Sequence, residues 1–151
     1  MRIDNWNLRF MEVLDWHKEA AVSFDWDPAR SENLFNCLTF SNSFVVAVTG
    51  RDVYKEHAAD LNYDTPLQAL KTLKSLGFNS VDQLIGSIFE AKDPNFVIRG
   101  DLVMIKSTED TNSPLHLMVA VADPPFYWTV SSTLGLARGN LRDIIKAYSV
   151  E

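Results

Sequence analysis

The strongest constraint on the fold is a change of hydrophobic period at Pro94. Before Pro94 the apolar residues recur every three or four positions, which is the spacing of helices with one buried face. After Pro94 they alternate with polar residues or form short continuous runs, which is typical of strands. Helices first and strands later predict an α+β fold in which N-terminal helices pack on a C-terminal antiparallel sheet. The chain has 151 residues and no repeat, so we expect a single domain over residues 1–151.

Four helices are predicted before Pro94. The first carries one apolar stripe, and the second shows an apolar face that predicts a central place in the fold. The third and fourth each begin with a capping signal and form a hairpin around Gly77. Their expected ranges are 5–18, then from 31 or 33 to 48, then Thr65 to Gly77, and Ser80 to about 88.

The second part of the chain predicts short strands joined by short loops, with one helix near the end. An extended piece is also expected earlier, at 22–26. Because the connections are short, we expect an antiparallel meander. The expected strands are 96–98, 102–105, 115–122, 126–130, 134–137 and 148–150, and the expected helix is 140–147.

Composition excludes several classes of function. The net charge is −6 and the basic residues form no run, which argues against nonspecific nucleic-acid binding. No apolar run approaches the roughly 20 residues of a membrane helix, and we expect neither membrane insertion nor a signal peptide. A single cysteine excludes an internal disulfide and a multi-cysteine zinc site. With only three dispersed histidines and no phosphate loop, we expect no metal and no cofactor.

Cys37 is the only cysteine, and it lies near the predicted start of the second helix. The positive end of a helix dipole favours the thiolate, which is the nucleophilic form. Periodicity alone favours a different role, because Cys37 shares an apolar face with Phe44 and Val48. Unpaired cysteine is among the most frequently buried residue types. The residues by themselves leave both interpretations open.

His116 is the best candidate for a base, because it opens the predicted strand that runs to 122. A histidine at the mouth of a strand can meet a thiol on a helix that packs against that strand. The alternative is a strand-end histidine that is half in solvent. His17 and His57 lie among polar neighbours, and we expect both to be exposed.

Three other motifs have structural explanations that we favour. Arg99-Gly100-Asp101 lies between two apolar runs, where glycine would bend the chain. Asp25 and Asp27 precede a predicted helix and are typical of turn and cap chemistry. The aromatic run 126–128 is more often a half-buried strand than a platform for a sugar or a base.

The order of these pieces resembles a family of small phage and prophage proteins related to the NlpC/P60 cysteine peptidases. The resemblance covers nearly the whole chain. Each motif is loose, whereas the order and spacing of the motifs together are fairly specific. They are Phe24-x-Trp26, Asn36 to Phe40, Val48 to Asp52, Leu76 to Phe78, Arg99 to Ile105, Gly135-Leu136 and Ala147 to Val150.

The resemblance implies a papain-like α+β fold of the NlpC/P60 type. In such enzymes the cysteine attacks a peptide carbonyl of peptidoglycan, so Cys37 would be the nucleophile and His116 the base. Thr129 would orient His116, with Ser131 as the other hydroxyl available. Backbone N–H groups near Cys37 would hold the oxyanion, helped by the side chain of Asn33 or Asn36.

The chain departs from the family pattern at three places. Asn36 stands where the family usually has an acidic residue, and Met118 stands where a small residue usually follows the histidine. The next strand offers no histidine, asparagine or glutamine, and a hydroxyl such as that of Thr129 holds an imidazolium less firmly than an amide or carboxylate does.

The resemblance therefore implies a phage tail-associated protein that cleaves peptidoglycan peptide bonds during cell entry, a cysteine endopeptidase. The alternative is a catalytically inactive structural component of a tail or neck that retains the fold. A third interpretation is an acidic cytoplasmic binding module unrelated to phage. For the phage interpretations we expect the protein to be made in the host cytoplasm and carried in the virion. Its partners would be other tail proteins and peptidoglycan, in an oligomeric arrangement.

Overall fold

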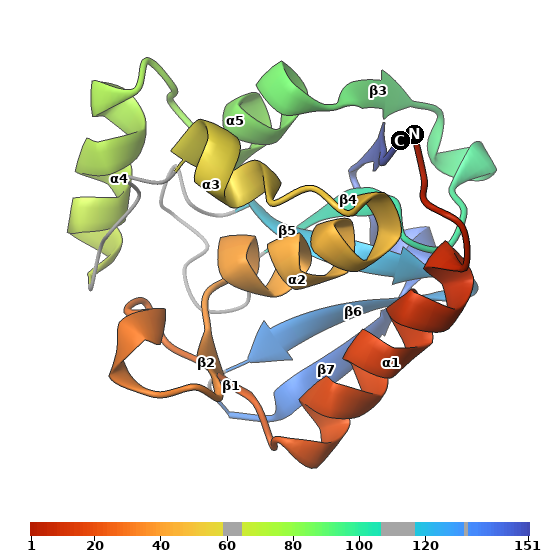
Figure 1. Cartoon of the computed structure of the whole chain (residues 1–151). Helices are drawn as coiled ribbons and strands as arrows, with labels where there is room; N and C mark the ends of the chain where they lie inside the picture. Colours follow the sequence, from red (N-terminus) through yellow and green to blue (C-terminus); the bar gives the residue numbers. More distant parts are fainter. Residues whose placement is uncertain (59–64, 107–116, 132) are drawn as a thin grey trace.

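The computed structural model describes residues 1–58, 65–106, 117–131 and 133–151. Helices from the first part of the chain cover one face of a six-stranded sheet built from the second part (Figure 1). The predicted α+β class and the packing of N-terminal helices on a C-terminal antiparallel sheet are confirmed. No helix among these residues is long and apolar enough to cross a membrane.

The first helix, α1 (Trp6–Glu19), packs against α2 (Cys37–Thr49), which lies across the centre of the sheet (Figure 1). The predicted stripe of α1 is confirmed, since Phe10 and Leu14 are fully buried. Gly50 ends α2 in the left-handed conformation, with φ of 73°.

The predicted start of the second helix at 31 or 33 is wrong, because α2 begins at Cys37. The residues before it form a short 3₁₀ turn, η1 (Pro28–Arg30), and then β2 (Leu34–Phe35). Strand β2 pairs in parallel with β1 (Ser23–Phe24), so the backbone stays extended up to Asn36. This pairing keeps the helix from starting earlier.

Three shorter helices follow: α3 (Val53–Ala58), α4 (Pro66–Ser75) and α5 (Val81–Ile88). The capping signals are confirmed, because the hydroxyls of Thr65 and Ser80 accept hydrogen bonds from the backbone three residues on. The sequence analysis did not predict α3.

The sheet has the strand order β3-β8-β4-β5-β6-β7, and every neighbouring pair is antiparallel. The predicted meander is confirmed for the run from β4 to β7. The final strand then returns to pair with β4 on the other side. The bounds are β3 (Glu90–Lys92), β4 (Leu102–Lys106), β5 (Leu117–Asp123), β6 (Phe126–Ser131), β7 (Gly135–Asn140) and β8 (Lys146–Ser149).

Two predicted elements near these strands are wrong. Residues 96–98 form no strand, because Asp93 caps a 3₁₀ turn, η2 (Pro94–Phe96). The predicted helix 140–147 is a 3₁₀ turn, η3 (Leu141–Asp143), and after two further residues β8 begins at Lys146. Pairing of β8 with both β3 and β4 replaces the helix that the local apolar spacing suggested.

The apolar side chains form two clusters, one on each face of the sheet. The inner cluster lies between sheet and helices and includes Val119, Val121 and Val130. The outer cluster includes Ala120 and Ala122, the alternate residues of β5. This alternation defines which face of the sheet each strand residue presents.

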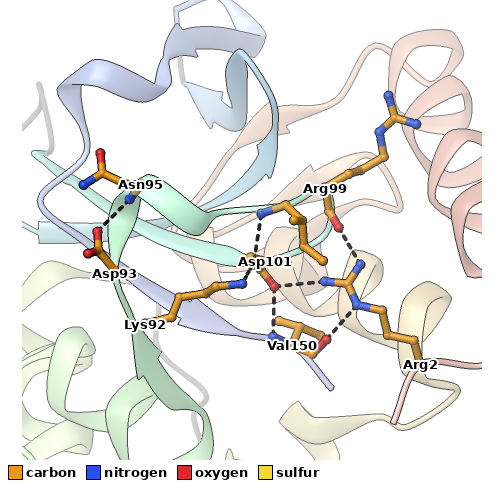
Figure 2. A network of polar contacts seen from close by, with 8 residues as sticks. Arg2, Lys92, Asp93, Asn95, Arg99, Asp101 and Val150 are labelled. Carbon is orange, nitrogen blue, oxygen red and sulfur yellow. Dashed lines mark hydrogen bonds and ion pairs between the residues drawn. The ribbon is translucent and has the colours of Figure 1, made fainter.

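Asp101, which ends the Arg-Gly-Asp motif, is fully buried and holds both chain ends in place (Figure 2). Its carboxylate accepts from Arg2 Nη2 at 2.9 Å and from Lys92 Nζ at 2.7 Å. It also accepts from the backbone N–H groups of Ile98 at 3.0 Å and Val150 at 3.2 Å. The predicted bend at Gly100 is confirmed by its φ of 89°, and the motif serves the fold.

Candidate functional site

Cys37 is the first residue of α2, directly after the capping residue Asn36. The Asn36 side chain accepts from Thr39 N at 2.9 Å, and the Thr39 hydroxyl accepts from Asn36 N at 3.0 Å. This reciprocal capping box fixes the first turn of the helix. It also fixes the place of the thiol, at the positive end of the helix dipole.

The thiol of Cys37 experiences two opposed influences. Burial raises the pKa of the thiol to about 11, while hydrogen bonds from the backbone N–H groups of Val119, Cys37 and Leu38 act in the opposite direction. Desolvation is the larger effect, because a thiolate loses more hydration than these groups restore. Activation of Cys37 near neutral pH therefore needs a cationic partner in addition to the helix terminus.

The contact with Val119 places the sulfur against the middle of β5. Among the described residues, β5 pairs with β6 at only three positions, and the pairing ends at Val121 with Trp128. Strand β5 stays paired with β4 as far as Leu117, and β6 stays paired with β7 as far as Ser131. The sheet is therefore split between β5 and β6 beside Cys37.

A pocket of about 440 Å³ lies beside Cys37 and takes its lining from both sides of this split. Helix α4 and the segment around β1 also contribute to its wall. The wall is largely apolar, as in many small-molecule and peptide sites. The described lining residues include Phe24, Trp26, Asn36, Cys37, Ala69, Leu117, Met118, Tyr127, Thr129, Val130, Ser131 and Leu134.

Two side chains that line the pocket have buried polar atoms without a hydrogen-bond partner among the described residues. They are Nδ2 of Asn36 and Oγ1 of Thr129. Asn36 is 1% exposed, so its amide donor has given up water without gaining an acceptor. An unpaired buried polar atom costs about 1–3 kcal/mol, so each one needs an explanation, and a catalytic role is one such explanation.

Of the two asparagines predicted as oxyanion donors, the structure favours one. Asn36 lines the pocket next to the thiol, with its donor unpaired. Asn33 does not belong to the described lining, and its amide is engaged elsewhere. Its Oδ1 accepts from Ser31 Oγ at 2.7 Å, and its Nδ2 donates to Ala21 O at 3.4 Å. The geometry thus favours Asn36 over Asn33 for this role.

Thr129 and Cys37 line the same pocket from different faces of the sheet. Thr129 alternates along β6 with Trp128 and Val130, which pack on the inner cluster, so it belongs to the other face. Cys37 packs against the inner cluster itself. His116 lies outside the described residues, so its pairing with Cys37 and with Thr129 stays a prediction.

The predicted exposure of His17 is wrong, because its side chain is fully buried between α1 and α2. Its Nε2 lies 2.9 Å from Ser43 Oγ, and the Ser43 hydroxyl donates to Phe40 O at 2.6 Å. This arrangement assigns the ring proton to Nε2 and leaves Nδ1 as a buried acceptor without a partner among the described residues. Burial lowers the pKa of His17 to about 4.

A sequence signal for this burial exists. His17 follows Phe10 and Leu14 at the i, i+4, i+7 spacing of the apolar stripe. Its immediate neighbours Trp16 and Lys18 are both exposed and obscured that position. The ring contacts the rings of Phe35, Phe40 and Phe44 at centroid distances of 4.8, 4.8 and 5.4 Å.

Within the part of the chain that the structure describes, no group of three or more histidine, cysteine, aspartate or glutamate side chains could hold a metal ion. The chemistry available there is that of a thiol, backbone N–H groups, an amide and a hydroxyl around an apolar pocket. That set suits attack on a carbonyl carbon whose oxygen receives hydrogen bonds.

Comparison with known proteins places the whole chain in one family. No curated protein and no solved structure matches the chain. A family model described as a domain of unknown function, DUF6950, matches residues 1–150. The chain is therefore a member of the DUF6950 family.

Proposed function

We propose that this protein is a cysteine hydrolase of the papain-like, NlpC/P60-related type that cleaves amide bonds in peptidoglycan peptides. One observation carries the proposal: Cys37 opens a buried helix beside a pocket that Asn36 also lines, and the buried amide donor of Asn36 has no partner among the described residues. The described order of elements is compatible with it, since the helix bearing Cys37 contacts β5, the strand that directly follows His116 in the sequence.

In the proposed reaction, His116 accepts the proton of the Cys37 thiol, and the sulfur attacks the carbonyl carbon of the substrate amide. The backbone N–H of Cys37 and Nδ2 of Asn36 donate to the oxygen that becomes negative. His116 then gives its proton to the leaving nitrogen, the C–N bond breaks and a thioester remains. Water, deprotonated by His116, attacks the thioester and releases a carboxylic acid and the free thiol.

The raised pKa of Cys37 indicates what His116 must contribute. With a pKa of about 11, only about one thiol in 10⁴ is ionised at pH 7. A neighbouring imidazolium favours the thiolate and lowers this pKa. Thr129, with its unpaired Oγ1, is the described side chain we propose as the acceptor that orients the imidazole.

The proposal places the protein on a phage tail, together with other tail proteins and in contact with peptidoglycan. The order and spacing of the sequence motifs support this part. The acidic net charge of −6 is compatible with a protein that does not bind nucleic acid.

The test is hydrolysis of purified peptidoglycan and of its soluble stem peptides, followed by mass spectrometry. The unmodified protein should release new amino and carboxyl ends in equal amounts. Cys37→Ala should abolish release while leaving the unfolding temperature nearly unchanged. Release by the Cys37→Ala protein at the normal rate would refute a role for the thiol.

The second candidate is an inactive structural component of a tail or neck that keeps this fold. The specific observation in its favour is the same pKa of about 11, because burial without a cationic partner gives an inert thiol. In that case no cleavage would occur, and Cys37→Ala would leave particle assembly and infectivity unchanged.

A further inference from the structure

The pocket beside Cys37 differs in charge from the chain as a whole. Its charged lining residues, among those the structure describes, are Lys106 and Arg138, and both are cationic. The whole chain carries a net charge of −6. Lys106 ends β4 and Arg138 lies in β7, and both are exposed. Neither makes an ion pair with a carboxylate of the described residues.

Arg138 is positioned by aromatic rings. Its guanidinium carbon lies 4.0 Å from the ring centre of Phe126 and 5.9 Å from that of Trp128. Trp128 is also its direct partner across the β6–β7 ladder. A guanidinium that rests on an aromatic face keeps its N–H edge available, and that edge matches the geometry of a carboxylate.

We infer that the pocket binds a peptide segment that carries a carboxylate, with Arg138 as the main anchor and Lys106 as a second positive charge. The inference rests on the proposed function, since it assigns the anion to the same pocket that would hold the scissile amide. The apolar wall, including Phe24 and Leu117, would contact the aliphatic part of the bound residue.

The experiment measures binding separately from cleavage, in the Cys37→Ala protein, by calorimetry and by NMR of the tryptophan indole N–H groups. The probes are N-acetyl-Ala-Ala-Glu-amide and N-acetyl-Ala-Ala-Gln-amide, which differ in charge and hardly in shape. We expect the glutamate peptide to bind about three- to ten-fold more tightly at low salt. The preference should shrink as the ionic strength rises, because these cations are exposed.

Two variants identify the anchor. Arg138→Gln should remove most of the preference for the glutamate peptide, and Lys106→Gln should remove part of it. The matched control is Arg142→Gln, which makes the same change of charge at an exposed arginine of η3 outside the described pocket lining. That variant should keep the preference.

The outcomes separate this inference from the proposed function. Equal binding of the two peptides, no binding of either, or a preference that survives Arg138→Gln would overturn the assignment of an anion site. Hydrolysis of stem peptides by the unmodified protein would still support the hydrolase in each of those cases. A preference lost in Arg138→Gln, together with no hydrolysis of any substrate, would support the anion site and refute the hydrolase.

Discussion

Replacing Asp101 by asparagine should be among the most destabilising isosteric changes possible in this chain. Every hydrogen-bond partner of the carboxylate is a donor. Figure 2 shows the side chains of Arg2 and Lys92 and the backbone N–H of Val150; the fourth donor is the backbone N–H of Ile98. An asparagine keeps one acceptor oxygen and turns the other into an NH₂ group. In either orientation that NH₂ faces donors, and no acceptor replaces the lost bonds.

The expected magnitude follows from burial and charge. Removing one partner of a buried ion pair typically costs about 3–5 kcal/mol. The Asp101 side chain is 0% exposed, whereas Arg2 and Lys92 are 11% and 21% exposed and can recover some hydration. We therefore expect a loss of about 3 kcal/mol. For a domain of this size, that corresponds to a fall in unfolding temperature of about 6–12 °C.

Urea denaturation and calorimetry at neutral pH measure this loss. The matched control is Asp93→Asn, a nearby exposed position where Oδ1 accepts from Asn95 N at 2.9 Å (Figure 2). Asparagine is as good a cap as aspartate, so the control should lose less than about 0.5 kcal/mol. A loss below about 1 kcal/mol for Asp101→Asn, or equal losses in both variants, would refute the reasoning.

Three further predictions concern single residues. His17 has a pKa of about 4 in the fold against an ordinary 6.5, so the unfolded chain binds a proton first as the pH falls. The free energy of unfolding, measured by urea denaturation, should therefore drop by up to about 3 kcal/mol between pH 6.5 and 4. It should drop less in His17→Phe, and equal drops in the two proteins would contradict this. Asn36→Ser keeps a capping side chain and adds no charge, but it loses the Nδ2 donor. We expect kcat/KM to fall about 10²–10³-fold; an equal fall in the control Asn33→Ser would exclude a specific donor. Gly100→Ala should lower the free energy of unfolding by about 1–3 kcal/mol, because φ is 89° and an added Cβ would lie 3.1 Å from Val48 Cγ2. Urea denaturation measures this loss, and an unchanged urea midpoint would contradict the prediction.

Features with a local cause were predictable from the sequence. The starts of α4 and α5 were found because the caps Thr65 and Ser80 act within one turn. The meander from β4 to β7 was found because short loops and the period of two are also local. Cys37 was placed near a helix start for the same reason.

Features with a non-local cause were missed. The true start of α2 depends on a two-residue pairing of Leu34–Phe35 with Ser23–Phe24, which no periodicity reveals. Strand β8 begins at Lys146, before the predicted strand 148–150, because β3 and β4 flank it; its first residues were assigned to a helix from their local apolar spacing. The carboxylate of Asp101 is satisfied by Arg2 and Lys92, neither of them adjacent in sequence.

The candidate site combines both kinds of feature. Cys37 and Asn36 carry local signals of a helix start, and both line the pocket. The split between β5 and β6 beside them depends on how far two strands stay paired. That extent depends on contacts between residues far apart in the chain and was not visible in the sequence.

The pH dependence of Cys37 alkylation tests the central claim most directly. Iodoacetamide rates would be measured from pH 5 to 11 on the unmodified protein and on His116→Ala, with one modified cysteine confirmed by mass spectrometry. A nucleophile paired with His116 predicts an apparent thiol pKa below about 8, with the rate at pH 7 falling at least about ten-fold in His116→Ala. An apparent pKa that stays at about 11 in both proteins would contradict the hydrolase and leave Cys37 as a buried structural thiol.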